Sequence, residues 1–187
     1  MSGPGSSAVA RCVLAIALAT GLTGCETTLP YTRSYIDAPA PMSAGDAIEV
    51  RLEPCIDRTG TGGRDVAADA TKAFREKLPA IGGLALKDDG RFRLACEVTT
   101  FVEGSAFKRW LMPGWGSTVG QVAAMVTDTR TGEIVAILRS NSTVAEGGLY
   151  SAGADTYILS VAVQDVVNQL RAWVNARGAA RNATGKE

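Results

Sequence analysis

The sequence contains no histidine. A Ser-His-Asp triad, a Cys-His pair and most imidazole zinc sites therefore cannot be built from this chain. Carboxylates remain as candidate acid–base groups, among them Glu97, Glu103 and Asp128, but glycan cleavage needs two carboxyl groups facing each other at about 5 to 10 Å. Nothing in the spacing of these residues predicts such a pair. We therefore expect a protein that is not an enzyme, with no cofactor and no metal site.

The chain also lacks an excess of either charge, because 19 Lys and Arg balance 19 Asp and Glu. A protein that is steered to nucleic acid or to anionic lipid by its overall field carries a net positive charge. No nucleic-acid partner is predicted.

No apolar run reaches the roughly 20 residues of a membrane-spanning helix. A shorter run from Val13 to Ala19 follows Arg11 and leads to Leu22-Thr23-Gly24-Cys25, an arrangement typical of a signal peptide. The tetrapeptide resembles the lipobox of bacterial lipoproteins. This resemblance implies that residues 1–24 are removed and that Cys25 becomes the acylated first residue, on which several acyl chains hold the protein to a membrane. An ordinary secretory signal with a chance cysteine is the alternative.

Glu26 follows the cysteine in this pattern. By resemblance to the sorting rule of enterobacterial lipoproteins, a residue other than Asp at this position implies the outer membrane in preference to the inner one. The domain would then lie in the periplasm, held by its lipid.

Two further cysteines, Cys55 and Cys96, lie in the expected mature chain. An even pair in an oxidising periplasm predicts a disulfide. Two separately buried thiols are the alternative.

The 163 residues that would follow the signal peptide suffice for one domain. Residues 25–45 are rich in Thr, Pro, Ala and Ser and predict a flexible tether, whose 20 residues after the cysteine reach about 65 Å when extended. Residues 46–177 form the predicted domain. Gly178 is expected to end its last helix, which leaves 178–187 as a disordered tail.

Hydrophobic periodicity predicts the elements of that domain. Alternation at 48–52 predicts a strand, a four-residue apolar spacing at 65–78 predicts a helix, and three strands follow at 91–102, 119–128 and 133–144. A second helix is expected at 156–176. The order strand, helix, three strands, helix predicts an α+β fold with one mostly antiparallel four-stranded sheet and two helices packed on one face.

The segment from Arg109 to Gly116, the turn from Asp128 to Gly132, the strand after it and the Gly-rich loop before the last helix resemble an uncharacterised family of bacterial lipoproteins with a domain of unknown function. Such domains look like the small α/β domain of the Tol-Pal β-propeller protein and of curli-secretion lipoproteins. The resemblance implies envelope assembly or partner docking, and it carries over no catalytic residues.

The candidate contact residues lie in one predicted loop, from Phe107 to Trp115. Two of the three tryptophans lie in it, beside Pro and Gly that disfavour regular structure. The rings either fold back over the core as a lid or form an exposed anchor, since Trp and Arg are enriched where partners dock. A membrane interface also suits Trp, but the lipid already supplies membrane binding, so a protein partner is favoured. The candidate contact residues are Phe107, Arg109, Trp110, Leu111, Pro113 and Trp115.

The sequence thus predicts a non-enzymatic, lipid-anchored envelope protein that acts as a protein-interaction module in outer-membrane assembly or maintenance. The alternative is a periplasmic carrier of a small ligand or lipid, which would need a closed apolar cavity.

Overall fold

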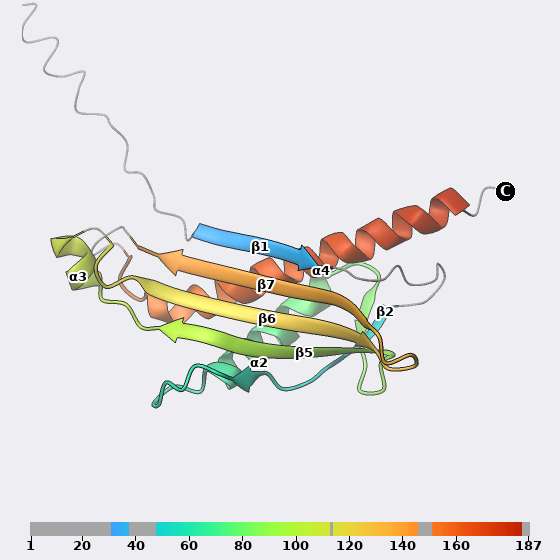
Figure 1. Cartoon of the computed structure of the whole chain (residues 1–187), viewed down its shortest axis with the longest axis horizontal. Coiled ribbons are helices and arrows are strands. Elements are labelled where there is room, and N and C mark those ends of the chain that lie inside the picture. The colour runs from blue at the N-terminus through green and yellow to red at the C-terminus, as the bar shows by residue number, and fades with distance from the viewer. Residues whose placement is uncertain (1–30, 38–47, 113, 146–150, 185–187) are drawn as a thin grey trace, which may run out of the picture.

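The computed structural model describes residues 31–37, 48–112, 114–145 and 151–184, with side chains omitted at 31–37 and 177–184. These residues form one mixed sheet, with two helices packed on one of its faces and a short helix at one of its ends (Figure 1). The strands are β1 (Tyr31–Asp37), β2 (Ile48–Leu52), β3 (Ile56–Asp57), β4 (Leu84–Leu86), β5 (Phe92–Val102), β6 (Thr118–Asp128) and β7 (Ile134–Val144). The helices are α2 (Val66–Lys77), the 3-10 turn η1 (Leu78–Ala80), α3 (Ala106–Leu111) and α4 (Ala154–Thr184).

The antiparallel strands β5, β6 and β7 are the centre of the sheet. Each has 11 residues, and along most of each strand buried residues alternate with more exposed ones. The β6–β7 hairpin turns at Gly132, whose φ of 76° favours glycine. The three strands predicted at 91–102, 119–128 and 133–144 are therefore confirmed.

The sheet is wider than predicted. In the described residues it has seven strands in the order β1-β7-β6-β5-β2-β4, with β3 beside β5. Strands β2 and β3 run parallel to β5, and β4 runs parallel to β2. The α+β class is correct. The mostly antiparallel four-stranded sheet is wrong in strand number and in part of the pairing, because β3 and β4 have only two and three residues and are too short to show a period. The predicted order of elements also lacks α3, a helix of six residues inside the segment that was expected to be a loop.

Strand β1 lies inside the segment predicted as a flexible tether. Its seven residues pair with β7 from Tyr31 to Asp37, so that prediction is wrong for 31–37. The pairing completes the edge of β7, whose backbone N–H and C=O groups would otherwise lack partners on that side. The remaining residues of the predicted tether, 25–30 and 38–45, lie outside the described residues.

Helices α2 and α4 pack on the same face of the sheet (Figure 1). Helix α2 begins at Asp65, whose carboxylate accepts a hydrogen bond from the Ala68 N–H at 2.8 Å, as a helix N-cap does. Between the helices and the sheet lies the core, which includes the fully buried side chains Phe74, Phe92, Leu94, Leu138, Ile158 and Leu170.

Helix α4 continues to Thr184. The prediction of a disordered tail from Gly178 is therefore wrong for 178–184, and 185–187 lie outside the described residues. A glycine inside a helix costs only about 1 kcal/mol relative to Ala, and the three residues Ala179, Ala180 and Ala183 that follow it favour helix. Among the described residues, no helix combines the length and the hydropathy of a membrane span.

Cys55 and Cys96 form a disulfide, with their Cα atoms 4.6 Å apart. The bond joins the segment between β2 and β3 to the middle of β5 and closes a loop of 41 residues in sequence separation. The predicted bridge is present, and the alternative of two separate thiols does not apply.

Candidate interaction surface

Helix α3 follows β5 after a connection of three residues. It lies at the end of the sheet where β5 ends and β6 begins (Figure 1). Ser105 caps it by accepting a hydrogen bond from the Lys108 N–H at 3.3 Å. After Leu111 the chain turns back, with the Trp115 N–H bonded to the Met112 carbonyl at 3.0 Å. The Gly114 N–H then donates to the Ala145 carbonyl at 3.1 Å, just beyond β7, so the segment is tied to the end of the sheet.

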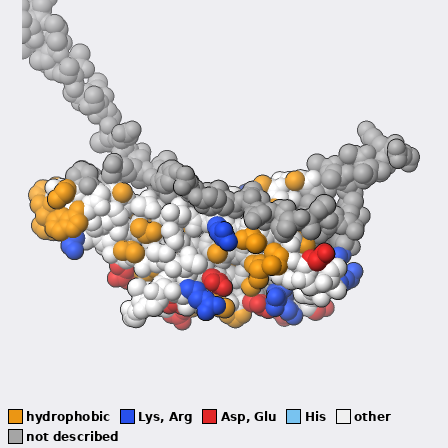
Figure 2. All heavy atoms as spheres, viewed as in Figure 1, with side chains coloured by type: hydrophobic (Ala, Val, Ile, Leu, Met, Phe, Trp, Pro, Cys, Tyr) orange, Lys and Arg blue, Asp and Glu red, His pale blue; other side chains and the backbone are white. Residues whose placement is uncertain are grey.

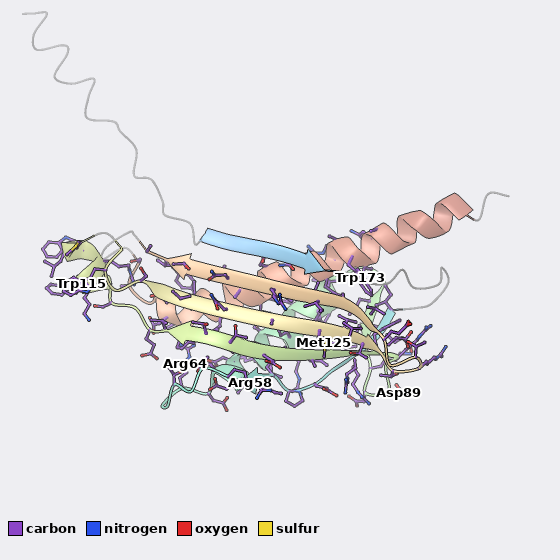
Figure 3. The ribbon with its side chains drawn as sticks, viewed as in Figure 1. Arg58, Arg64, Asp89, Trp115, Met125 and Trp173 are labelled. Carbon is purple, nitrogen blue, oxygen red and sulfur yellow. A yellow bond between two sulfur atoms is a disulfide. The ribbon has the colours of Figure 1, made fainter. Side chains whose placement is uncertain are left out.

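The side chains of this segment form an exposed apolar cluster, which we call the aromatic tip. Its members and their exposed fractions are Phe107 (59%), Trp110 (59%), Leu111 (54%), Met112 (58%) and Trp115 (49%). They are five of the nine large apolar side chains that are exposed in the described part of the chain. Figure 2 shows this apolar surface gathered at one end of the molecule, and Figure 3 places Trp115 at that end.

The rings therefore do not fold back over the core as a lid. The Phe107 and Trp110 ring centroids lie 5.9 Å apart, and the Lys108 ammonium lies 5.5 Å from the Trp115 ring centroid. These contacts arrange the tip internally but leave about half of each apolar side chain in solvent. Pro113, also predicted as a contact, lies outside the described residues.

Arg109 differs from its neighbours because it points inward and is only 4% exposed. Its guanidinium donates to the Ser151 hydroxyl at 2.9 Å, the Ser151 carbonyl at 3.0 Å, the Gly116 carbonyl at 2.7 Å and the Thr118 hydroxyl at 3.0 Å. Gly116 and Thr118 belong to the chain directly after the tip, and Ser151 belongs to the segment before α4. Arg109 thus holds the tip in place and offers no surface to a partner, which corrects its predicted role.

Two glycines make room for this arrangement. A Cβ at Gly104 would lie 2.4 Å from the Arg109 guanidinium, and one at Gly116, where φ is 77°, would lie 2.7 Å from the Lys108 Cβ. The sequence carries a signal for the inward direction of Arg109. In a short helix, Phe107, Trp110 and Leu111 lie on one side, and Arg109 lies on the opposite side.

The three candidate carboxylates do not come together. Asp128 pairs with Phe92 at one end of β5, Glu97 lies five residues further along, and Glu103 follows the other end of β5. At about 3.3 Å per residue, Asp128 and Glu97 are roughly 16 Å apart along the strand, beyond the separation that glycan cleavage requires. Among the described residues no group of three His, Cys, Asp or Glu side chains is placed to hold a metal ion.

Asp128 has a structural partner. The Arg91 guanidinium binds its carboxylate through Nε at 3.0 Å and Nη2 at 2.5 Å, and the Arg130 N–H donates to it at 3.0 Å. The hydrogen bonds from Arg91 hold the pKa of Asp128 below its ordinary value, although burial opposes the shift. Glu97 is half-exposed and pairs with Arg58 at 3.4 Å.

No protein-family model matches the sequence, and no curated protein matches it. Among solved structures, the PelC dodecamer from Paraburkholderia phytofirmans is similar at 15% sequence identity and a TM-score of 0.52, over 75% of this chain and 97% of the PelC chain. A point variant of PelC in another crystal form gives the same values. The chain has a PelC-like fold.

Two other solved structures are less similar. Protein XCC0632 of the DUF330 family from Xanthomonas campestris gives a TM-score of 0.47 at 14% identity, covering 76% of this chain and 94% of its own. Lipoprotein GNA1162 from Neisseria meningitidis gives a TM-score of 0.39 at 12% identity, covering 64% of this chain and 96% of the GNA1162 chain. The likeness to PelC extends to the fold alone, and the predicted likeness to the Tol-Pal and curli-secretion domains stays a prediction.

Proposed function

We propose that this protein is a non-enzymatic, lipid-anchored component of the bacterial envelope that acts as an interaction module in outer-membrane assembly or maintenance, with the aromatic tip as its contact surface. The observation that supports this most directly is the exposure of five large apolar side chains at one end of the domain. Contiguous exposed apolar surface marks interaction sites in soluble domains.

The tip is a firmly supported surface. Four hydrogen bonds of the buried Arg109 and the backbone bonds of Gly114 and Trp115 fix its shape. A surface that is ordered before contact loses less conformational entropy on binding. The exposed rings are Trp and Phe, which provide large contact area with few rotatable bonds.

The predicted anchor places this surface in the envelope. Acylation of Cys25 would hold the domain on a membrane without a spanning helix, and Glu26 favours the outer membrane by the sorting rule. The disulfide between Cys55 and Cys96 suits the oxidising periplasm.

A carrier of a small ligand or lipid is the second candidate. Four hollows in the described surface have volumes of 210 to 380 Å³, and each of these four is open to solvent. One of them, of 260 Å³ beside Phe101 and Arg64, is also lined by Gly62 and Glu103. Because a carrier requires an enclosed apolar cavity, these open hollows favour the interaction module.

Site-specific photocrosslinking in intact cells tests the proposal. A photoreactive amino acid replaces Trp110 in the tip, and a matched protein carries it in place of Ile134, which is 38% exposed at the opposite end of the sheet. We expect adducts with an envelope component, protein or lipid, from position 110 and few from position 134. Equal yields at both positions would contradict a contact role for the tip.

A measurement of stability tests separately whether the tip tryptophans belong to the core. The double variant Trp110→Ala, Trp115→Ala should keep the free energy of unfolding within about 1 kcal/mol of the wild type, because both rings are about half exposed and each surface substitution changes it by about 0.5 kcal/mol or less. A loss of several kcal/mol would instead assign these rings to the core.

A further inference from the structure

The chain enters the sheet at the end that carries the aromatic tip. Tyr31, the first residue of β1, pairs with Thr143 near the end of β7, and two residues later the Ala145 carbonyl accepts the hydrogen bond from Gly114. Two steps between neighbouring backbones, of about 5 Å each, and two residues along β7, of about 3.4 Å each, place Tyr31 within about 17 Å of the backbone at the tip. Figure 1 shows α3 and the start of β1 at the same end of the sheet.

The predicted lipid lies very close to that end. Only five residues separate Cys25 from Tyr31, so the chain between them spans at most about 22 Å even when extended. The 20-residue tether expected from composition would have allowed about 65 Å. Because β1 belongs to the sheet, the acyl chains on Cys25 keep this end of the domain close to the bilayer.

The chemistry of the tip fits a lipid interface. Trp side chains prefer the headgroup level of a bilayer, and Phe and Leu accompany Trp on the apolar faces of helices that lie in a membrane interface. Leu111 and Met112 of the tip add purely apolar surface that is more than half exposed. The sequence from Ser105 to Thr118 contains no acidic residue, and the exposed Lys108 at its centre can bind a lipid phosphate. A second, weaker membrane contact beside a covalent anchor would fix how the domain is oriented.

We propose that the aromatic tip inserts into the interfacial layer of the same bilayer that holds the acyl chains of Cys25. This inference rests on the lipid anchor of the proposed function. It departs from the expectation of a protein partner, which was based on the lipid anchor already supplying membrane binding. Insertion to about 5 to 10 Å is the depth that interfacial apolar segments reach, and it would hold the sheet end-on to the bilayer.

Tryptophan quenching in proteoliposomes tests the proposal with the full, processed lipoprotein. Vesicles of phosphatidylethanolamine and phosphatidylglycerol are prepared with and without brominated acyl chains. In the variant Trp173→Phe, the remaining tryptophans are Trp110 and Trp115 of the tip. In the matched variant Trp110→Phe, Trp115→Phe, the remaining one is Trp173, which is 7% exposed and far along α4 from the tip.

We expect brominated lipid to quench the tip tryptophans by about half or more, since they would lie at headgroup depth, and to leave Trp173 almost unchanged. Flotation with the vesicles and the mass of the N-terminal peptide report acylation of Cys25 independently. A protein that floats while its tip tryptophans stay unquenched would overturn the insertion.

The outcomes separate the two proposals. A protein crosslink from position 110, together with unquenched tip tryptophans, overturns insertion and preserves the interaction module. A chain that is not acylated and does not float removes the anchor, and with it the proposed function. Quenching of the tip in an acylated, floating protein supports insertion.

Discussion

At the scale of single residues, Arg109 shows how a charged side chain can support a surface without belonging to it. Its guanidinium is buried and donates to four neutral oxygens on Gly116, Thr118 and Ser151. The planar fork of an arginine reaches several acceptors at once, which lysine cannot do. The exposed rings on either side therefore depend on Arg109 for their placement.

Replacement of Arg109 by Met should lower the free energy of unfolding by about 2 kcal/mol, because buried acceptors would lose their donor. Arg109→Lys should recover only part of this. Urea denaturation measures the effect, and Lys108→Met is the matched control, expected within about 0.5 kcal/mol of the wild type because Lys108 is exposed. Equal stabilities of the Arg109→Met and Lys108→Met proteins would contradict the supporting role.

Asp128 gives the stability a defined pH dependence. Its pKa is lowered in the folded protein, chiefly by the hydrogen bonds from Arg91. The contribution of the Arg91–Asp128 pair to the free energy of unfolding is therefore fully present above the unfolded-state pKa of about 3.9. It is lost as the pH falls through the lower pKa of Asp128 in the folded protein.

The variant Asp128→Asn should be about 2 kcal/mol less stable than the wild type at pH 7, because Arg91 and the Arg130 N–H lose a charged acceptor. The difference should shrink below about pH 4. Urea denaturation across this range checks both statements, with Glu133→Gln as the control for an exposed carboxylate in the same hairpin. A difference that stays constant down to pH 2 would exclude the pair as its source.

At the scale of elements, β1 is the strand whose presence changes the interpretation most. It pairs with β7 over seven residues and thereby shortens the connection between the domain and Cys25 from the 20 residues predicted to five. Along an edge strand, successive N–H groups point alternately toward the neighbouring strand and away from it. This alternation allows a direct test of the pairing.

The double variant Arg33→Pro, Ser34→Pro removes two successive N–H groups, so one of them must be a donor to β7. We expect faster hydrogen exchange in β1 and at the β7 amides on that side, with β7 amides bonded to β6 unchanged. Arg33→Ala, Ser34→Ala should leave exchange near the wild-type rate. If the proline variant exchanges like the alanine variant, β1 is not paired in solution.

At the scale of the whole molecule, the sheet has two distinct ends. The aromatic tip and the start of β1 lie at one end, and the β6–β7 hairpin around Arg130 lies at the other. The 11 residues of β6 separate them by about 35 Å. An end-on domain would therefore keep the hairpin well away from the bilayer.

Spin labels on Leu111→Cys and Arg130→Cys should report this orientation in proteoliposomes of the acylated protein. The remaining cysteines should not react, because Cys55 and Cys96 are bridged and acylation, as predicted, would block the Cys25 thiol. Collisions with oxygen, which concentrates in lipid, should dominate at position 111, and collisions with a water-soluble nickel complex at position 130. If collisions with the nickel complex dominate at both positions, the end-on arrangement is wrong.

The sequence by itself determined the features that depend on local chemistry. Alternation predicted β5, β6 and β7, a four-residue apolar spacing predicted α2, and Asp65 marked its start. The lack of histidine removed whole classes of active site. The loop with Trp110 and Trp115 was also identified from composition, since two of three tryptophans in a short Pro- and Gly-containing segment depart from a random distribution.

Only the tertiary structure decided what depends on residues far apart in the chain. Strand β1 forms because β7 offers an unpaired edge, and its own sequence has no strong period. Arg109 turns inward because Ser151, 42 residues later, provides acceptors. The rings are exposed because α3 lies beyond the end of the sheet, where no core surface faces them. Local periodicity reports which side of an element is apolar, whereas the partner of that side is set by long-range packing.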